Sequence, residues 1–508
     1  MGICQTEKHF TYIIFPFKTD KTFIDVENIR FKKSNGKLHA IWERQALKLN
    51  KPQDDFRLLF DMENERRNIV KQYRFNPNLN KDFGVNRQYF ARTKEEETGM
   101  EIEGFNLFLF ETGIGFFTVK MNYQTRETDR ILELNYLLSD VKRKESRLYY
   151  EANEMATDGE KTYTSLVAFM KKTLADYLPV YDFDERDGLD YVDRKPLNFS
   201  YYLLQERLDE ESLGQLMFDA RSNYRAAYKA PDAEKALRSA NNLQTFENSY
   251  WGISINGATN ISCRTLDERT DRFFEEEFIQ RLQGIYLAMY LNVLNRYFTL
   301  KELRRGYLNL DGANIYIKEQ AFKVAVDKNE IDQKLLKTLE KQEVVQLTKY
   351  CEEVKELNNR ATIFTLKNAK MLPSNVEHVN TVYELMNRVY EIEETKQQLE
   401  KDRVSAKEIG DSYMRRINKL SEAVRELKKA KSEIFIYCLL TIFGFLSTFH
   451  DLVEIVEFFL GRVIWNTVYM WIPWTIIAIP VGVLCFKIVE SVREYSEKKK
   501  ELEDLILQ

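Results

Sequence analysis

The residues best placed to do chemistry lie near the C-terminus, where polar side chains recur inside an apolar stretch. Tyr437, Thr441, Gly444, Thr448 and Asp451 are spaced alternately by four and three residues, so they share one face of a helix. When identical helices surround an axis, such a face forms a wet wall for cations, and we expect the first four residues to line a pore. The alternative is that the hydroxyls bond a neighbouring helix.

Charged residues flank this line on both sides. We expect an acidic outer mouth that concentrates cations, formed by Asp451, Glu454 and Glu457. On the other side we expect an inner basic ring, formed by Lys428, Lys429 and Lys431. These lysines would repel cations until the helices separate, or would only contact anionic lipid.

Two apolar stretches predict membrane spans. The stretch 463–486 is free of charge for 24 residues, enough to cross a hydrocarbon core of about 30 Å. The stretch 434–449 has only 16 such residues, which also fits a re-entrant or interfacial helix. We expect a first transmembrane helix with the start of the outer loop at 434–458, an outer loop at 459–462, a second transmembrane helix at 463–489 and a basic tail at 490–508. Basic residues flank the two predicted spans, so we expect both termini to face the cytoplasm and the protein to lie in a bacterial plasma membrane.

A very long helix precedes the first predicted span. Pro373 stops the preceding segment, and Ser374 with Glu377 fits a capping box. No proline follows until well past Phe449, so we expect one continuous helix of about 75 residues, roughly 110 Å at 1.5 Å per residue, with a stalk at 373–433. Gly410 is either a hinge or a tolerated glycine. A seam with coiled-coil spacing comprises Tyr413, Arg416, Leu420, Ala423, Leu427, Ala430 and Ile434.

The N-terminal half reads as an α+β cytosolic domain. We expect a mixed α/β sensor domain at 1–265, with a strand at 10–17, a hairpin at 105–123 that turns at 112–115 and an exposed loop at 184–196. A helical cytosolic region should follow at 266–372. Its spacing predicts a long buried helix from Asp271 onward and a charged helix at 329–368.

Composition limits the function classes. The 508 residues carry a net charge of −4 from 75 basic and 79 acidic side chains, so we expect no direct nucleic-acid binding. Four scattered histidines and five isolated cysteines form no metal-binding or nucleophile motif, and we expect no enzyme activity. Gly2 and Thr6 match a myristoylation pattern, with Cys4 as an acylation candidate; chance is the alternative explanation.

Two basic clusters could bind the phosphates of an anionic ligand. One is Arg304 with Arg305, and the other is Arg221, Arg225 and Lys229, spaced by four residues. Arginine fits phosphate well because it donates two parallel hydrogen bonds. The alternative is that both clusters are ordinary solvated faces. The gating-ligand site and any metal site stay unassigned.

Taken together, a large α/β domain, one stalk helix running into a span, a short acidic loop, a second span and a basic tail resemble CorA-type magnesium channels. The hairpin FNLFLFETGIGFFTVKMNY also looks like part of that family's N-terminal sheet. The resemblance implies a homo-oligomer, a pentamer in that family, in a lipid bilayer, with magnesium or another divalent cation. The seam alone would also suit a trimer or tetramer.

This sequence departs from that family at its signature. The family's Gly-Met-Asn motif is absent, and GFLSTFHD, residues 444–451, stands in its place, so its selectivity residues do not carry over. The departure resembles CorA-like effectors beside type III CRISPR systems, which implies gating by a nucleotide second messenger in antiviral defence. The alternatives are a magnesium transporter closed by cytosolic magnesium and a non-conducting, membrane-tethered coiled-coil scaffold.

Overall fold

The computed structural model divides the chain into two compact units, each drawing on the predicted regions 266–372 and 373–433. Unit 1 comprises residues 1–304 and 361–400, and unit 2 comprises 305–360 and 401–508. The structure describes residues 4–18, 31–34, 37–40, 42–45, 49, 51–60, 69–75, 88–92, 97–139, 147–151, 161–163, 166, 196–224, 229–265, 267–310, 333–367, 372–460 and 471–507.

Unit 1 is built on one large mixed sheet. In the described part of the chain its strand order is β10-β9-β6-β7-β8-β1-β11-β14-β13-β12, and β5 joins β4 to β7. The β11–β14 pair is parallel and the other pairs are antiparallel. The strands are β1 (Thr6–Lys18), β4 (Trp42–Gln45), β5 (Val70–Phe75), β6 (Gln88–Arg92), β7 (Glu97–Phe110), β8 (Ile114–Tyr123), β9 (Arg147–Glu151), β10 (Lys161–Tyr163), β11 (Leu197–Leu204), β12 (Asn242–Phe246), β13 (Ser249–Ser254) and β14 (Gly257–Cys263). A separate hairpin pairs β2 (Phe31–Ser34) with β3 (Lys37–Ala40).

The predicted strand and hairpin are confirmed. β1 contains the predicted strand 10–17, and β7 and β8 form the predicted antiparallel hairpin. Gly113 in its turn has a φ of 86°, a conformation that glycine adopts without a Cβ clash. The predicted loop lies outside the described residues except for its last position, Pro196.

The two faces of the sheet have different partners. Because side chains alternate along a strand, one face of β1, β7 and β8 is apolar, with Ile13, Leu107 and Val119 fully buried. It packs into one core with α3 (Thr128–Ser139) and α5 (Glu210–Ser222). On the opposite face lies the helical run from α7 (Glu268–Arg272) through α9 (Leu287–Leu308), with Phe116 against Phe298, ring centroids 6.2 Å apart.

The buried helix predicted from Asp271 onward is present, with two irregular stretches. The π-helical segments η4 (Phe273–Glu277) and η5 (Leu282–Tyr286) flank α8 (Phe278–Arg281). Short helices α2 (Asp54–Phe60), α6 (Asp232–Lys235) and α12 (Glu377–Val389) complete unit 1. Single-turn π segments in helices are frequent at functional sites, so this stretch marks where a site is expected.

The predicted continuous helix is broken near its start. α12 ends at Val389 and α13 (Ile392–Leu460) begins three residues later, because Glu391 has a φ of 49° in the left-handed region. The capping box is also not formed: Ser374 Oγ accepts a hydrogen bond from the Val376 N–H at 3.2 Å, and α12 has no side-chain cap. The 69 residues of α13 confirm a very long helix beyond this break.

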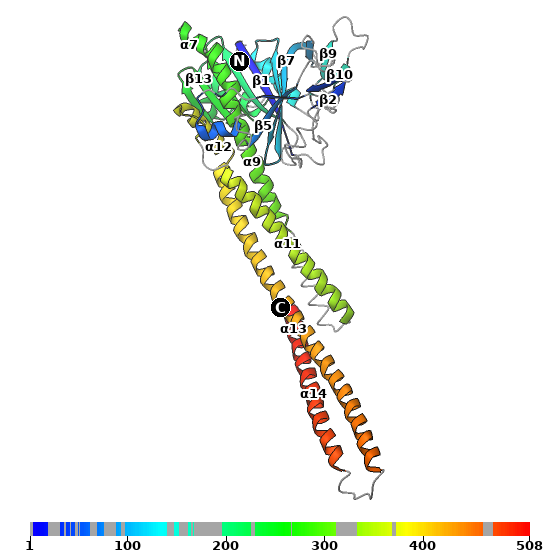
Figure 1. Ribbon diagram of the computed structural model, residues 1–508. Coiled ribbons are helices and arrows are strands. Elements are labelled where there is room, and N and C mark those ends of the chain that lie inside the picture. The colour runs from blue at the N-terminus through cyan, green and yellow to red at the C-terminus, as the bar shows by residue number, and fades with distance from the viewer. Residues whose placement is uncertain are drawn as a thin grey trace. The chain divides into compact units, whose positions relative to one another are not determined.

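Unit 2 consists of long helices that pack on one another (Figure 1). α11 (Gln333–Lys367) confirms the charged helix predicted at 329–368, and its Tyr350 ring packs against Tyr413 of α13 at 5.3 Å between centroids. α14 (Trp471–Leu507) runs back along α13, with Lys498 Nζ 3.7 Å from Glu426 Oε2. These partners of α13 come from the same chain.

The two predicted membrane spans are not confirmed. Within the described ranges, no helix combines the length and the apolar character needed to cross a bilayer. This corrects the fold class, which ended in two transmembrane helices, the assignment as a membrane protein and ion channel, and the predicted membrane location with cytoplasmic termini. The charge-free part of α13 has 16 residues, and so does the described part of the second stretch, 471–486, whereas a span needs about 20. Residues 463–470 lie outside the described part.

Candidate ligand-binding site

Two adjoining cavities open between the sheet and the π-helical segments. The first, of about 520 Å³, lies beside β1, β7, β8 and the residues Ile279 and Gln283. The second, of about 500 Å³, extends over β4, β5 and β7 to Gly284 and Leu287. Both include Glu103, Lys120 and Gln283, so we treat them as one groove. Each half is large enough to hold a small molecule.

The strand register explains why polar residues gather in the groove. Arg74 of β5 lies opposite Asn106 of β7, and Lys120 of β8 lies opposite Tyr12 of β1. Alternate residues on each strand point to the same face. The further groove residues on that face are Gln45, Gln72, Asn122, Phe10 and Lys8.

Glu103 lies at the centre of the groove because of a β-bulge. The β7–β8 register shifts between Ile102 and Gly104, which leaves Glu103 as an extra residue; bulges of this kind re-aim a side chain. Lys120 Nζ and Asn122 Nδ2 both donate hydrogen bonds to the Glu103 carboxylate. Lys120 also lies over the Phe10 ring, 5.5 Å from its centroid, so its charge has a second favourable partner.

The second half of the groove carries a further cation. The Arg74 side chain is exposed and passes beside Gly104, where a Cβ would lie 3.8 Å from Arg74 Nε. Burial raises the pKa of Tyr12, as does the nearby Glu103 charge, while Arg74 lowers it. The phenol therefore stays neutral at physiological pH and can act as a hydrogen-bond donor.

Two amide oxygens in the groove have no hydrogen-bond donor among the described residues. These are Gln72 Oε1 and Asn122 Oδ1, and both atoms are buried. The orientation of Asn122 is set by Glu103, because a carboxylate accepts but does not donate, so the amide nitrogen faces it. A buried acceptor without a donor costs about 1–3 kcal/mol, a cost that a ligand donor would remove.

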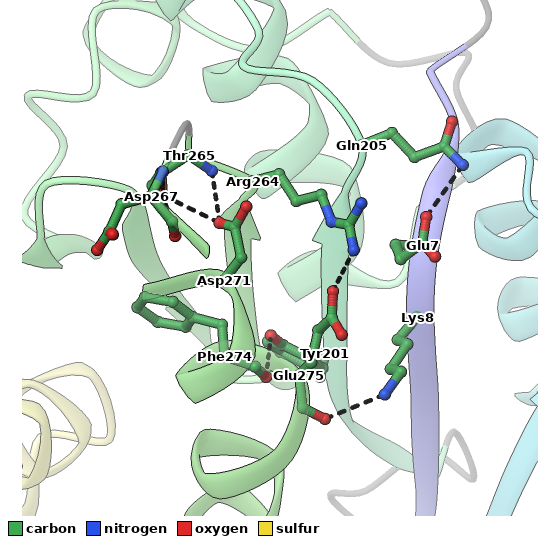
Figure 2. Close-up of polar contacts among 10 residues, drawn as sticks. All are labelled: Glu7, Lys8, Tyr201, Gln205, Arg264, Thr265, Asp267, Asp271, Phe274 and Glu275. Atoms are coloured by element: carbon green, nitrogen blue, oxygen red, sulfur yellow. Dashed lines mark hydrogen bonds and ion pairs between the residues drawn. The ribbon is translucent and has the colours of Figure 1, made fainter. Parts of the chain in front are cut away.

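The π-helical wall of the groove is anchored by side chains from the sheet (Figure 2). Lys8 Nζ donates to the Glu275 carbonyl at 3.2 Å, and the buried Tyr201 hydroxyl donates to the Phe274 carbonyl at 3.1 Å. The Arg264 guanidinium bonds the Glu275 carboxylate. Since π turns depart from the regular i to i−4 pattern, these donors satisfy carbonyls where the helix is irregular.

A loop contact holds the start of the same helical run. Asp271 accepts from the Thr265 backbone N–H at 2.6 Å and from its hydroxyl at 3.0 Å. Asp267 caps α7 by accepting from the Thr270 N–H at 3.1 Å, and Gln205 bonds Glu7 on β1 at 3.3 Å. Figure 2 shows the Thr265–Asp271 and Gln205–Glu7 contacts. The wall is therefore fixed at its N-terminal end.

The other end of the wall continues into α9, which contacts the start of α13 through a buried polar network. Arg296 Nη1 donates to Asn387 Oδ1 of α12 at 2.7 Å, and Arg296 Nη2 lies 3.5 Å from Glu393 Oε1 of α13. Tyr290 and Tyr390 join their hydroxyls at 3.0 Å. A displacement of the groove wall therefore has a direct route, within unit 1, to the first turn of α13.

His9, at the end of the first cavity, is neutral. Its Nε2 accepts from the Tyr123 backbone N–H at 3.1 Å, and the two rings stack with centroids 6.0 Å apart. Burial lowers the pKa of His9 to about 4. The cationic character of the groove at neutral pH therefore comes from lysine and arginine side chains.

The residues predicted to line a pore are on α13 in unit 2, and the groove belongs to unit 1. Thr441 Oγ1 donates to the Tyr437 carbonyl of its own helix at 2.7 Å, and Tyr437 is close enough to Lys487 of α14 to raise its pKa, after the larger effect of Glu490. Gly444 is exposed. The side chain of Thr448 lies outside the described part of the chain.

The charged groups predicted at the two mouths are on the same helix. Glu454 is exposed, while the side chains of Asp451 and Glu457 lie outside the described part. Lys428, Lys429 and Lys431 are exposed, and Ala430 between them is buried. Of the predicted seam residues whose side chains the structure describes, Ala430 is buried, and Tyr413, Ala423, Leu427 and Ile434 are half-buried.

The predicted basic clusters have different environments. Arg221 is buried, bonding the Glu234 carboxylate and donating to Asn242 Oδ1 at 2.6 Å, so its charge is already neutralised. Arg225 lies outside the described residues and Lys229 is exposed. Arg304 and Arg305 lie in the last turns of α9. Of the residues in these clusters that the structure describes, none lines the groove.

No motif in the sequence predicts the groove. The available signal is local: Asn106, Lys120 and Asn122 interrupt otherwise apolar strands at positions of one parity along each strand, which is the pattern of a polar patch on one face. Metal ligands are not grouped in the described part of the chain, where no three His, Cys, Asp or Glu side chains converge.

Comparisons with known proteins do not assign the chain to a family. No protein-family model matches the sequence, and no curated protein matches it either. The resemblance to CorA-type channels therefore rests on the residues quoted in the sequence analysis alone.

Proposed function

We propose that this protein is a sensor that binds a small anionic molecule, with nucleotides as the expected class, in the groove of unit 1. The single observation that carries the proposal is the groove itself, where cations and amides meet under a wall that continues into α9. Lys120 and Arg74 supply the charge for a phosphate, and Lys8 and Arg126 line the first cavity. No covalent chemistry is assigned to the site.

Neutral groups in the groove suit the rest of a nucleotide. Gln45, Gln72, Asn106, Gln280 and Gln283 line the second cavity, and amide side chains can both donate to and accept from base edges and sugar hydroxyls. This combination favours a nucleotide over inorganic phosphate.

The response to the ligand is proposed to travel through the wall. A ligand that contacts Gln280, Gln283 or Gly284 would favour one position of η5, and α9 follows η5 without a break. Arg296 then connects α9 to the first turn of α13. Binding can shift such a helix only to the extent that the ligand prefers one arrangement over the other.

The second part of the proposal is self-association through the α13–α14 hairpin of unit 2. Ile436, Leu440 and Phe443 on α13 are 51–63% exposed at spacings of four and three, and on α14 Val483 and Phe486 are 57% and 68% exposed. Each such side chain gains about 1.5–3 kcal/mol on full burial. Because a second copy carries the same two stripes, the surface is complementary to itself, and the occupant we propose is that copy.

Ligand binding to the full-length chain tests the first part. We expect isothermal titration calorimetry to detect at least one of the four nucleoside 5′-monophosphates, and the matching nucleoside without phosphate to bind at least about tenfold more weakly. Arg74→Ala should lose about tenfold or more in affinity for the phosphate compound. The matched control is Arg207→Ala, an exposed arginine of the same unit, which should bind normally.

Either of two results would overturn the sensor proposal. One is an absence of binding by every monophosphate, and the other is equal loss in both arginine variants. The first result, from a chain shown to be folded and oligomeric, would favour the scaffold alternative, in which unit 1 presents a surface to protein partners.

A further inference from the structure

Among the described residues, Glu103 is the one acidic side chain that belongs to both halves of the groove. It is partly exposed, at 29% of its side-chain surface, and its partner Lys120 is 15% exposed. An anion would bind Lys120 more tightly if no carboxylate were already paired with this lysine. The pairing of Glu103 with Lys120 therefore has to be explained.

The β-bulge in β7 explains how Glu103 comes to lie beside Lys120. A regular β7 strand would alternate its side chains without interruption, whereas the extra residue between Ile102 and Gly104 places the carboxylate where Lys120 and Asn122 both reach it. Two donors on β8 thus hold one acid from β7. The Glu103 carboxylate therefore occupies the position beside Lys120 and Asn122 that the phosphate of a ligand would take.

We propose that Glu103 is a built-in competitor for the ligand's phosphate and makes the groove select a terminal, dianionic phosphate. This inference rests on the proposed function. A carboxylate carries one negative charge, whereas a phosphate monoester carries about −1.5 to −2 at pH 7. The monoester therefore displaces Glu103 from Lys120, while a phosphodiester, with one charge, gains little from the exchange.

Release of Glu103 also frees the amide of Asn122. Once the carboxylate leaves, Asn122 can donate to a phosphate oxygen, or turn so that its oxygen accepts from a ligand hydroxyl or amino group. The buried Oδ1, which has no donor among the described residues, would then be satisfied. The Asn122 contact adds affinity only for a ligand that has displaced Glu103.

The test compares a nucleoside 5′-monophosphate with its 3′,5′-cyclic form, which has the same base and sugar but a diester. Calorimetry on the full-length protein should show the monophosphate binding at least about tenfold more tightly, a difference of about 1.4 kcal/mol. In Glu103→Gln the cyclic compound should bind several-fold more tightly than in the parent, so that the ratio falls below about three. The control is Glu211→Gln, which removes an acid from the exposed Lys235 pair outside the groove.

A second measurement follows Lys120 without any ligand. Acetylation by a water-soluble reagent, read by peptide mass spectrometry, should modify Lys120 faster in Glu103→Gln than in the parent, with Lys235 unchanged. If Glu103→Gln does not fold, Asn122→Ala removes one of the two bonds that hold the carboxylate and should speed the acetylation of Lys120 by a smaller factor, whereas an unchanged rate would contradict the competitor role.

The outcomes separate the two proposals. Unchanged affinities in Glu103→Gln would overturn the competitor role and leave the sensor intact. Weaker binding of both compounds would also overturn it, because Glu103 would then be a direct contact of the ligand. If no monophosphate binds either the parent or the variant, the proposed function fails and this inference fails with it.

Discussion

The sheet domain of unit 1 and the α13–α14 hairpin of unit 2 differ in where their large apolar side chains lie. In the sheet domain Trp251, Tyr73 and Phe117 are almost completely buried, and one set of polar side chains lines a groove. In the hairpin Phe435, Phe443 and others stand out from the helices at more than 60% exposure. The first region buries its large apolar side chains within one chain, whereas the second leaves several of them exposed.

This difference follows from the two kinds of secondary structure. A sheet covered by helices on both faces buries residues of both parities along its strands. A pair of helices buries one stripe on each helix, and any further apolar residues remain outside. The apolar residues Ile436, Leu440 and Phe443 of α13 remain exposed in this way, and a second copy of the chain is their proposed partner.

The largest expected effect is on assembly. Replacing Phe443 and Phe486 together by aspartate puts charges on both exposed stripes, where a buried unpaired charge costs several kcal/mol. We expect the parent to be oligomeric and the double variant to be a monomer by light scattering on a size-exclusion column. Glu454→Gln, at an exposed polar site of α13, is the control. A parent that is monomeric at every concentration would contradict the self-association proposal.

The second largest expected effect is on the stability of the sheet domain. Arg221→Ala should destabilise unit 1 by about 3–5 kcal/mol, because it leaves the buried Glu234 carboxylate without its partner. Arg207→Ala removes an ion pair of 3.9 Å whose side chains are 61% and 90% exposed, so it should cost at most about 1 kcal/mol. Urea unfolding followed by tryptophan fluorescence measures both.

Equal free energies of unfolding for the Arg221 and Arg207 variants would contradict the structural role of Arg221. Such a result would mean that Arg221 is a solvent-exposed member of the basic cluster predicted from the sequence. Arg221→Lys adds a third case, since it keeps the charge but loses the bond to Asn242, and it should fall between the other two.

The smallest effect concerns pH. Burial raises the pKa of Asp219 to about 7, opposed by a hydrogen bond from Gln215 and assisted by the charge of Asp129. The folded chain therefore keeps a proton on Asp219 that the unfolded chain loses near pH 4. The contribution of Asp219 to the free energy of unfolding thus falls as pH rises from about 4 to 7.

Asp219→Asn removes this titration while keeping the shape of the side chain. We expect its melting temperature relative to the parent to rise by a few degrees between pH 5 and pH 8, with Asp129→Asn giving a smaller change in the same direction. Differential scanning calorimetry at four pH values gives the comparison. A constant difference between variant and parent across that range would show that Asp219 is not the titrating group.

Much of the secondary structure could be predicted from neighbouring residues. The β7–β8 hairpin follows from alternation around a turn with glycine at position 113, and the run from Asp271 into α9 follows from helical spacing. Those signals are local, because each depends on residues within a few positions. The two membrane spans are not found in the described ranges, where each stretch has 16 charge-free residues and a span needs about 20.

The break before α13 shows where local signals end. Nothing in the local spacing marks Glu391 as left-handed, a conformation that costs a non-glycine residue roughly 1–2 kcal/mol. The surrounding contacts offset this cost: Tyr390 is buried against Tyr290, and Glu393 faces Arg296. These partners lie about a hundred residues apart in the chain.

The sequence by itself determined the strand β1, the β7–β8 hairpin and the long helices α9, α11 and α13. Tertiary structure alone decided that Arg74 and Lys120 share a groove and that a bulge directs Glu103 to Lys120. The physical reason is the distance along the chain over which each feature is decided. Helix and strand periodicity depends on residues a few positions apart, whereas the pairing of strands that are distant in sequence depends on their register across the whole sheet.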